Sequence, residues 1–269
     1  SKVKPGILIT HIDGIRLTPD VNPNQLMNTR GGKKVRLKLT DPESGSDWEE
    51  VFTPIGQGQQ RGALYERWIK GRRDLVDKLS DGRIGYVHVA GMNDSSFRRF
   101  YKDVLGVNSD KEALIIDTRY NRGGWLHDDL VSFLSGKDYV YIQPRGKKRG
   151  DLGAEPVSRW SRPFAVVQNE ANYSDAHMFP YAVKQLKLGK LVGAPVAGTG
   201  TAVWWEQQIN PEIIFGIPQV GMVTPDGNYL ENLELQPDVE VYNTPDSVED
   251  GKDLQIEKAV EVLLKKKES

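Results

Sequence analysis

The chain has 269 residues, enough to bury a full-sized hydrophobic core in one large domain or in two. Hydrophobic residues make up 38% and charged residues 27%, with a formal net charge of −1, which is typical of a soluble globular protein and gives no global field toward nucleic acid or an anionic membrane. The absence of cysteine excludes disulfides, thiolate nucleophiles and cysteine-bound zinc. Four scattered histidines without an HExxH pattern give little support to a metal, so we expect no cofactor.

The beginning of the chain resembles neither a membrane span nor a signal peptide. No apolar run approaches the ~20 residues that cross a bilayer. The first ten residues, "SKVKPGILIT", have a charged start but no long apolar centre. Because the chain starts with Ser1 and enters an apolar run almost at once, we interpret it as a fragment or a processed form.

Residues 1–57 predict a small β-rich unit. "PGILITHIDGIRL" indicates a strand, an Asp-Gly turn and a second short strand, "GGKKVRLKLTD" alternates as a half-buried strand does, and "SDWEEVFTPI" supplies the last strand. "NPNQLMNTR" has helical spacing. The glycine- and glutamine-rich segment 55–63, "IGQGQQRGA", is a predicted linker, and "LYERWIKGRRDLVDKLS" after it predicts an amphipathic helix that ends near residue 80.

Residues 81–269 alternate between strand and helix patterns. "IGYVHVA", "EALIIDTRY", "YVYIQP", "PFAVVQ" and "KLVGAPV" predict strands. "SSFRRFYKDVLG", "HDDLVSFLSG", the segment after Ser174 and "KDLQIEKAVEVLLKKK" predict helices. This alternation favours an α/β layered domain.

The stretch "NEANYSDAHMFPYAV", residues 169–183, places Ser174 at a turn between a predicted buried strand and a helix. One interpretation is helix capping, which adds about 1 kcal/mol. The other is a nucleophile beside a backbone N–H, that of Asp175, aimed at a developing oxyanion. The surrounding residues are not a GxSxG elbow, so the serine alone leaves both interpretations open.

A second stretch, "LIIDTRYNRGGW" (residues 114–125), runs from a buried strand into Asn-Arg-Gly-Gly. The glycines either serve a tight turn with positive φ or leave a backbone N–H accessible where a side chain would block it. A donor from this loop and one from the turn at Ser174 would together make a two-point oxyanion hole.

The ordered set "GRIGYVHV", "DTRYNRGG", "NEANYSDA" and "ENLELQPDVEV", after a partial PDZ-like start, resembles the C-terminal region of the tricorn-type proteases. It resembles more loosely the tail-specific (C-terminal processing) serine proteases. The resemblance implies an α/β fold in which a partial, β-rich PDZ-like domain (1–57) and a linker and helix (58–80) precede a crotonase-like (ClpP-like) ββα layered catalytic domain (81–269). The implied activity is serine endopeptidase cleavage of peptides.

The resemblance also implies roles for individual residues. Ser174 is the expected nucleophile, and the expected oxyanion hole consists of the N–H groups of Asp175 and of a glycine of the NRGG turn. We favour Gly124 over Gly123 for the second donor and place Gly123 among the substrate-binding residues. Glu231 matches the glutamate that steadies the catalytic histidine through a second serine.

Glu234 is a nearby rival for the role of Glu231. In the tricorn-type enzymes the general base is a histidine N-terminal to the PDZ domain, and this chain has no residue at the matching position. The tail-specific relatives use a lysine in the glycine-rich segment after the nucleophile, but "GAPVAGTGTAVWW" contains none. We therefore expect the chain to lack its own general base.

The four histidines fall at other points of the pattern. We expect a structural role for His88, within a strand, and a surface position rather than a base for His177. His127, after the NRGG turn, is the best substitute for the missing base, and His11 belongs to the PDZ-like unit.

Two weaker signals concern substrate binding. We expect one of Trp204 and Trp205 to pack in the core and the other, assigned to Trp204, to line a substrate groove. The basic cluster 143–151, "QPRGKKRGD", is either a solvated loop or a rim that favours acidic substrate segments.

The expected partner is a peptide or unfolded polypeptide, with no nucleic acid or membrane partner and a homo-oligomer in a full-length parent. A cytoplasmic location is expected, or a periplasmic or exported one if a signal peptide has been removed. Two alternatives remain: a non-catalytic scaffold that binds peptides through the PDZ-like unit and a vestigial cleft, and a crotonase-type acyl-transfer enzyme. Only a protease requires an accessible, reactive hydroxyl at Ser174.

Overall fold

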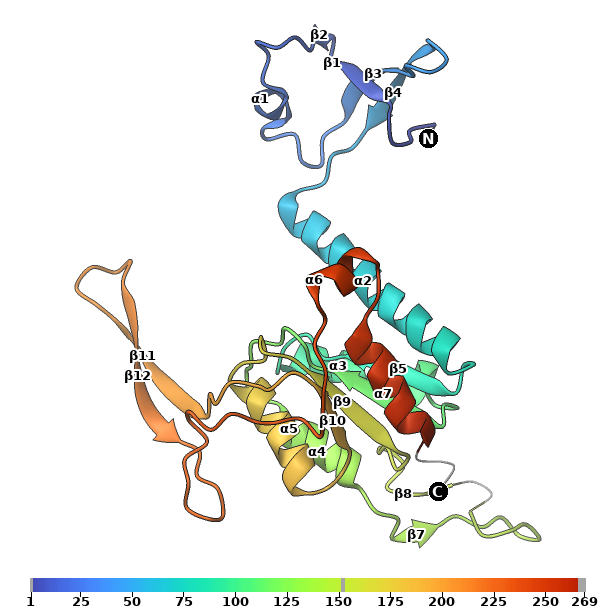
Figure 1. Ribbon diagram of the computed structural model, residues 1–269, viewed down its shortest axis with the longest axis vertical. Helices are drawn as coiled ribbons and strands as arrows, with labels where there is room; N and C mark the ends of the chain where they lie inside the picture. Colours follow the sequence, from blue (N-terminus) through green and yellow to red (C-terminus); the bar gives the residue numbers. More distant parts are fainter. Residues whose placement is uncertain (1, 151–152, 266–269) are drawn as a thin grey trace. The chain divides into compact units, whose positions relative to one another are not determined.

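The computed structural model describes residues 2–150 and 153–265 (Figure 1). The chain divides into two compact units, Ser1–Trp68 and Ile69–Ser269. The boundary falls inside helix α2 (Gln57–Leu79). Each unit has its own buried apolar side chains.

The first unit is built on a four-stranded antiparallel sheet in the order β2-β1-β3-β4. Its elements are β1 (Leu8–Ile12), β2 (Ile15–Arg16), α1 (Pro23–Met27), β3 (Val35–Thr40) and β4 (Asp47–Phe52). The alternation that predicted these strands places Ile12, Val35 and Leu39 on the buried face. The short helix α1 begins with an Asn22 cap, whose side chain accepts the N–H of Asn24.

The segment 55–63, which was expected to be a linker, is helical from Gln57 onward. Glycine in a helix costs about 1 kcal/mol relative to alanine. The glutamines, arginine and alanine between these glycines are good helix formers, and the helix continues into a part with buried side chains, Ile69 and Val76. Its amphipathic second half outweighs the glycines at its start.

The second unit contains a five-stranded parallel sheet in the order β13-β10-β9-β6-β5. Its strands are β5 (Ile84–His88), β6 (Ala113–Asp117), β9 (Phe164–Gln168), β10 (Lys190–Gly193) and β13 (Val239–Glu240). Every residue of β5, β6 and β9 is buried, as expected for a parallel sheet covered on both faces. The α/β class predicted from the alternation of strands and helices is confirmed.

Helices cover both faces of this sheet (Figure 1). They are α3 (Asp94–Lys102), continued by the π-helical turn η1 (Asp103–Val107), α4 (His127–Ser135), α5 (Asp175–Gln185) and α7 (Leu254–Lys265). The short helix α6 (Pro245–Glu249) precedes α7 in the chain. One core cluster joins alternate strand residues such as Leu114 and Val166 to Phe100 of α3, Leu130 of α4 and Phe179 of α5. Helix α7 packs against β6, β9 and β10.

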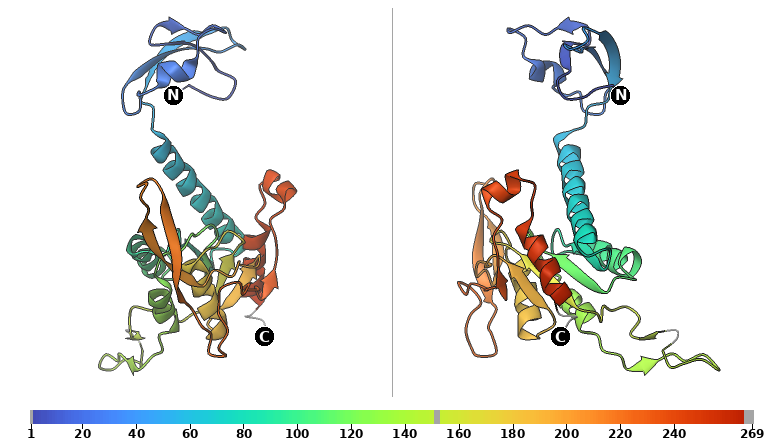
Figure 2. Two further views of the ribbon diagram at one scale, coloured as in Figure 1. Left: turned by 90° about the vertical axis from the view of Figure 1, so that its left-hand side faces the viewer. Right: turned by 45° about the vertical axis from the view of Figure 1, so that its right-hand side comes forward.

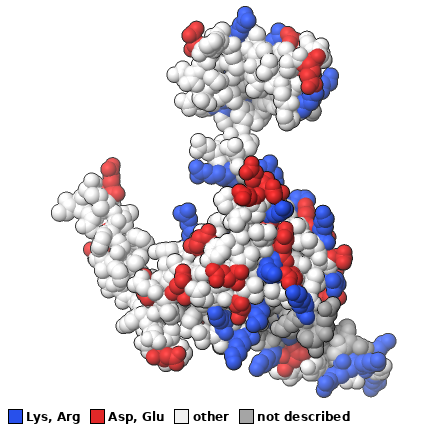
Figure 3. Space-filling view, in the orientation of Figure 1, with Lys and Arg blue, Asp and Glu red and all other residues white. Residues whose placement is uncertain are grey.

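Two hairpins extend from the sheet of the second unit: β7 (Val140–Tyr141) with β8 (Ala154–Glu155), and β11 (Thr201–Gln207) with β12 (Ile214–Gly221). Figure 2 shows the β11–β12 hairpin standing beside the sheet, and Figure 3 shows few charges on it. Trp204 and Trp205 lie on β11 and are 66% and 69% exposed, so the expectation that one of them packs in the core was wrong. A two-stranded hairpin has no second layer that could bury them.

Candidate active site

Two of the segments singled out in the sequence meet at one edge of the parallel sheet. The turn at Ser174 follows β9, and the Asn-Arg-Gly-Gly turn follows β6, its neighbour in the sheet. Because both strands are parallel, their carboxyl ends lie at the same edge, where open α/β sheets bind ligands. The backbone N–H of Tyr173 donates to the carbonyl of Asn121 at 3.0 Å and joins the two turns directly.

Ser174 has an unusual backbone conformation, with φ +55° and ψ −121°. Non-glycine residues rarely adopt positive φ, and such strain costs about 1–3 kcal/mol. The residue stands at the N-cap position of α5, but its side chain makes no capping hydrogen bond. The capping interpretation therefore does not explain this serine.

The two glycines of the NRGG turn lie so close to neighbouring segments that a side chain would not fit at either position. A Cβ on Gly123, which has φ +92°, would lie 2.7 Å from the Cβ of Ser174 and 3.1 Å from the backbone nitrogen of Asp175. A Cβ on Gly124, which has φ +140°, would lie 1.9 Å from the carbonyl oxygen of Met92. The NRGG turn thus packs against the Ser174 turn at Gly123 and against Met92 at Gly124, at distances that leave no room for a side chain on either glycine.

Some backbone N–H groups of the two turns donate hydrogen bonds and others do not. The N–H of Gly123 donates to the side-chain oxygen of Asn121 at 2.9 Å, and the N–H of Ser174 donates to Oγ1 of Thr199 at 2.7 Å. Within the described residues, the N–H groups of Gly124 and Asp175 donate no hydrogen bond. Of the two glycines, it is therefore Gly124 and not Gly123 whose N–H has no described partner.

The carboxylate of Asp175 points away from these free donors, toward the start of α4. It is buried and accepts the N–H of Leu126 at 2.5 Å, the N–H of His127 at 3.1 Å and Nδ1 of His127 at 2.5 Å. The hydrogen bond to Asp175 raises the pKa of His127, with smaller contributions from the charges of Asp128 and Asp129. His127 is thus engaged with Asp175 and is not hydrogen-bonded to the Ser174 hydroxyl.

Thr199, from the glycine-rich loop after β10, is a second residue whose side chain contacts Ser174. Thr199 accepts the Ser174 N–H and donates its own N–H to Nδ1 of His177 at 3.3 Å. The His177 ring is fully buried, which lowers its pKa, while the charge of Glu231 raises it. The expectation that His177 is a surface residue was wrong, because α5 packs this face against the loop at Thr199.

The two candidate glutamates differ in their surroundings. The backbone nitrogen of Glu231 lies against Gly200, where a Cβ would approach it to 3.1 Å, and its charge acts on His177. Glu234 instead accepts the side-chain amide of Gln236 at 2.7 Å. The structure therefore places Glu231, and not Glu234, next to the loop that contacts Ser174.

The strand β6 is anchored behind the NRGG turn by a buried ionic cluster. Arg119, which is 1% exposed, contacts the carboxylates of Asp117 and Asp253 at 2.7 and 2.9 Å. The hydroxyl of Tyr86 donates to Asp117 at 2.8 Å. His88 also lies here, buried with Nε2 3.0 Å from the carbonyl of Arg119, and burial lowers its pKa. These contacts fix the residues that lead into the turn.

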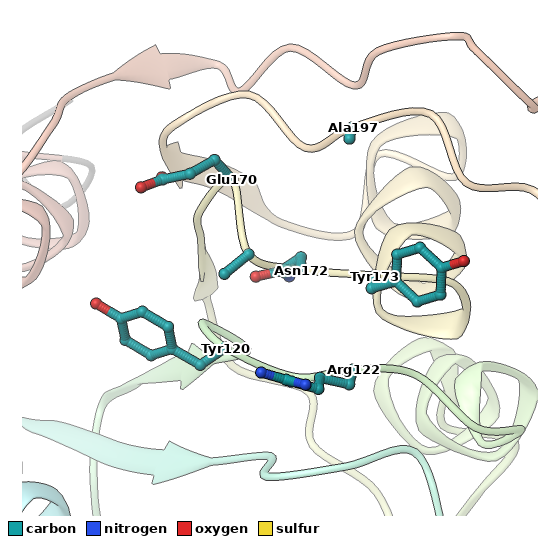
Figure 4. Close-up of a pocket in the computed structure, with 7 residues that line it drawn as sticks. Tyr120, Arg122, Glu170, Asn172, Tyr173 and Ala197 are labelled. Carbon is teal, nitrogen blue, oxygen red and sulfur yellow. The ribbon is translucent and has the colours of Figure 1, made fainter.

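Two hollows lie near Ser174, of which only the smaller is lined by the serine itself. A small one of about 60 Å³ is lined by Trp125, Met178, Ala202 and Met222 together with Ser174 itself. A larger, open one of about 620 Å³ lies between the two turns (Figure 4), with Tyr120 and Tyr173 at its ends and Arg122 between them. Ligand pockets usually measure about 300–1,000 Å³. Trp204 lines neither hollow, so its part in substrate binding stays a prediction.

Among the described residues, no proton acceptor is in place at the Ser174 hydroxyl. In the described ranges 2–150 and 153–265, no side-chain nitrogen is hydrogen-bonded to the hydroxyl of Ser174. His11 lies in the first unit, with Nδ1 near the Thr10 hydroxyl. The same ranges contain no group of three or more His, Asp or Glu side chains that could hold a metal ion. No helix in them is both long and apolar enough to span a bilayer.

Sequence reasoning missed Thr199 and Asn121. The signal for Thr199 was its position between two glycines, Gly198 and Gly200, in a loop noted only for lacking lysine. Asn121, which is fully buried, lies within the quoted NRGG motif, but its contacts, to Gly123 N–H and to the carbonyl of Val89 at 2.8 Å, depend on the fold.

Known proteins resemble this chain in sequence and fold over nearly its whole length. The sequence model of peptidase family S41 matches residues 83–241, more than half of the chain. The tricorn protease of Thermoplasma acidophilum is 29% identical over 261 residues, which are 96% of this chain and 24% of that protein. Tricorn protease homolog 1 of Streptomyces coelicolor is 27% identical over 263 residues, which are 97% of this chain and 24% of that protein.

The crystal structure of the tricorn protease has the same fold, with a TM-score of 0.81 and 25% sequence identity over 98% of this chain and 25% of that one. The chain thus spans about a quarter of the length of these relatives. The resemblance inferred from the ordered motifs is confirmed.

Proposed function

The chain belongs to peptidase family S41, and on this basis we propose that it carries the nucleophile-bearing part of a serine endopeptidase of the tricorn and tail-specific type. The observation that carries the proposal is the backbone at Ser174. A strained serine that caps no helix lies in a site where two N–H groups, those of Gly124 and Asp175, have no hydrogen-bond acceptor among the described residues. Backbone strain of this kind clusters at functional sites.

In the proposed reaction, Ser174 Oγ attacks the carbonyl carbon of the scissile peptide bond and loses its proton to a general base. The carbonyl oxygen becomes an oxyanion, which accepts hydrogen bonds from the N–H groups of Gly124 and Asp175. The C–N bond then breaks as the leaving amine takes the proton, and water hydrolyses the acyl-enzyme. Each preorganised donor of this type contributes about 10²–10³ in rate.

We assign the general base to a residue outside the described part of the chain. A serine hydroxyl is a weak nucleophile unless a base accepts its proton. None of the described histidines contacts the Ser174 hydroxyl, and the relatives are about four times as long as this chain. Glu231, next to the Thr199 loop, is then the residue that orients the incoming base.

The finer domain assignment follows the same family. We propose that residues 1–57 are a partial PDZ-like domain, 58–80 a linker and helix, and 81–269 a crotonase-like catalytic domain. The antiparallel sheet of the first unit and the parallel, helix-covered sheet of the second support this division. The proposed location is the cytoplasm, with a homo-oligomer as the assembly of the whole protein.

The substrate is a peptide or unfolded polypeptide. The open hollow, which Tyr173 lines next to Ser174 in the chain, has the volume for a few residues of a peptide. A Cβ on Gly123 would lie 2.7 Å from the Cβ of Ser174, so the glycine leaves the approach to the nucleophile open on this side. Arg122, which forms no ion pair with the described residues, is available to a carboxylate of the substrate. The apolar side chains of the small hollow, Met178 and Met222, then receive the side chain before the scissile bond.

The test is labelling of this chain with a fluorophosphonate, in which the Ser174 oxygen bonds to phosphorus, fluoride leaves and a base takes the proton. Because no described side chain is hydrogen-bonded to the Ser174 hydroxyl as a base, imidazole is added as an external one. We expect slow labelling that increases with imidazole concentration, located by mass spectrometry in residues 169–183.

Ser174→Ala should abolish the adduct, and Ser95→Ala, at an exposed serine of α3, should leave it unchanged. Absence of an adduct on Ser174 at every imidazole concentration would reject the proposed nucleophile. Rapid labelling without imidazole would instead show that a base lies within these residues.

A further inference from the structure

Asp175 is proposed to act in the oxyanion hole through its backbone N–H, which does not require a carboxylate side chain. The carboxylate makes separate contacts, with the start of helix α4. Helix α4 begins after Leu126, which provides no side-chain cap. The Asp175 carboxylate, from the start of α5, accepts the first N–H groups of α4, those of Leu126 at 2.5 Å and His127 at 3.1 Å. A negative charge at a helix N-terminus is also favoured by the helix dipole. Asp175 therefore joins the starts of two helices.

This connection also joins the two proposed oxyanion donors. One donor is the N–H of Asp175 itself, and the other is the N–H of Gly124, two residues before Leu126. At the other end of the turn, the Tyr173 N–H donates to the carbonyl of Asn121 at 3.0 Å. The segment that contains Gly124 is thus tied to the nucleophile turn both before and after the glycine.

His127 completes the environment of the carboxylate. Its Nδ1 lies 2.5 Å from Oδ1 of Asp175, while both backbone N–H groups are bonded to Oδ2. Without the imidazole, Oδ1 has no described partner, and the buried carboxylate can rotate about its Cβ–Cγ bond. The ring is held in place by an edge contact with Trp125, with centroids 5.4 Å apart.

We propose that His127, through the Asp175 carboxylate, is a positioning residue that sets the separation of the Gly124 and Asp175 N–H donors. The inference rests on the proposed function, since it concerns the oxyanion hole of that reaction. Preorganised donors act only when they are already aligned on the developing charge. We call the hydrogen bonds of the Asp175 carboxylate to Leu126 N–H, His127 N–H and His127 Nδ1 the clamp. A misplacement of about 1 Å costs up to about 100-fold in rate, so loosening the clamp should slow attack by Ser174 without removing any reacting group.

The test compares three substitutions of the clamp in the fluorophosphonate and imidazole assay. His127→Leu removes the donor to Oδ1, and we expect labelling about 10- to 100-fold slower. His127→Asn places an amide nitrogen near the position of Nδ1, and it should restore most of the rate. Asp175→Asn keeps the backbone N–H but lacks one carboxylate oxygen, and it should resemble His127→Leu.

Asp128→Asn is the matched control, since it removes an exposed carboxylate next to His127 that contacts neither turn. It should label at the wild-type rate. Thermal unfolding of each variant shows whether it is folded at the assay temperature, and hydrogen exchange of residues 121–128 should rise in the slow variants. A purely structural role would lower the unfolding temperature without the rescue by asparagine.

The outcomes separate this inference from the proposed function. If the wild-type chain is labelled on Ser174 but His127→Leu and Asp175→Asn react at the same rate, the clamp is wrong and the nucleophile stands. Equal slowing by His127→Asn and His127→Leu would also overturn it, because the hydrogen bond would then be irrelevant. If the wild-type chain is never labelled, both proposals fail.

Discussion

Replacing Thr199 with valine keeps the volume of the side chain but removes the hydroxyl that accepts the Ser174 N–H at 2.7 Å. The donor then loses its partner in a partly buried turn. An unsatisfied buried donor costs about 1–3 kcal/mol, and partial exposure of Thr199 favours the lower half of that range, about 1–2 kcal/mol. In a unit the size of Ile69–Ser269, this corresponds to a decrease in melting temperature of roughly 2–8 °C.

The larger effect should be on reactivity. The positive φ of Ser174 is itself strained by about 1–3 kcal/mol, and the bond to Thr199 is one of the contacts that hold it. We expect fluorophosphonate labelling of Thr199→Val to be about tenfold slower, since a backbone that relaxes moves the hydroxyl away from the oxyanion donors. Thr199→Ser, which retains the hydroxyl, should react at nearly the wild-type rate. Equal labelling of the valine variant and the wild type would refute the view that Thr199 maintains this conformation.

Three further predictions concern other parts of the site. Gly124→Ala should abolish labelling, since its Cβ would lie 1.9 Å from the carbonyl oxygen of Met92, and circular dichroism would show whether the fold survives. Arg119→Met should lower stability by about 3–5 kcal/mol in urea unfolding, because it leaves two buried carboxylates without their shared cation, and a loss below about 1 kcal/mol would contradict this. Burial lowers the pKa of His177 below its ordinary 6.5, so the unfolded state binds a proton that the folded state does not. Stability should therefore decrease as pH falls below about 6.5, and His177→Gln should reduce that loss in urea midpoints measured between pH 7.5 and 5.

Local patterns predicted most of the second unit. The largely apolar segments that form β5, β6 and β9 need burial on both faces of a sheet. The segments between them have the spacing of amphipathic helices, which can cover those faces. A parallel α/β sheet could therefore be predicted from the sequence. The same patterns did not predict that residues 57–63, which include two glycines, belong to a helix. They also failed to predict the β11–β12 hairpin, whose exposed tryptophans resemble core residues.

The sequence by itself determined that Ser174 follows a buried strand, that two glycines follow the neighbouring one, and that no cysteine is available for the chemistry. It also carried the ordered motifs by which the family could be inferred. These properties are local, because hydrophobic period, turn composition and residue type can be read within a few positions.

Only the tertiary structure decided which polar groups around Ser174 form hydrogen bonds and with which partners. It brought His127 to Asp175 across 48 positions and Thr199 to Ser174 across 25. It also buried His177 and left the N–H of Gly124, rather than that of Gly123, without a described partner. Hydrogen-bond occupancy depends on distances of a few tenths of an ångström between segments distant in the chain, and those distances are set by packing of the whole unit and not by any local pattern.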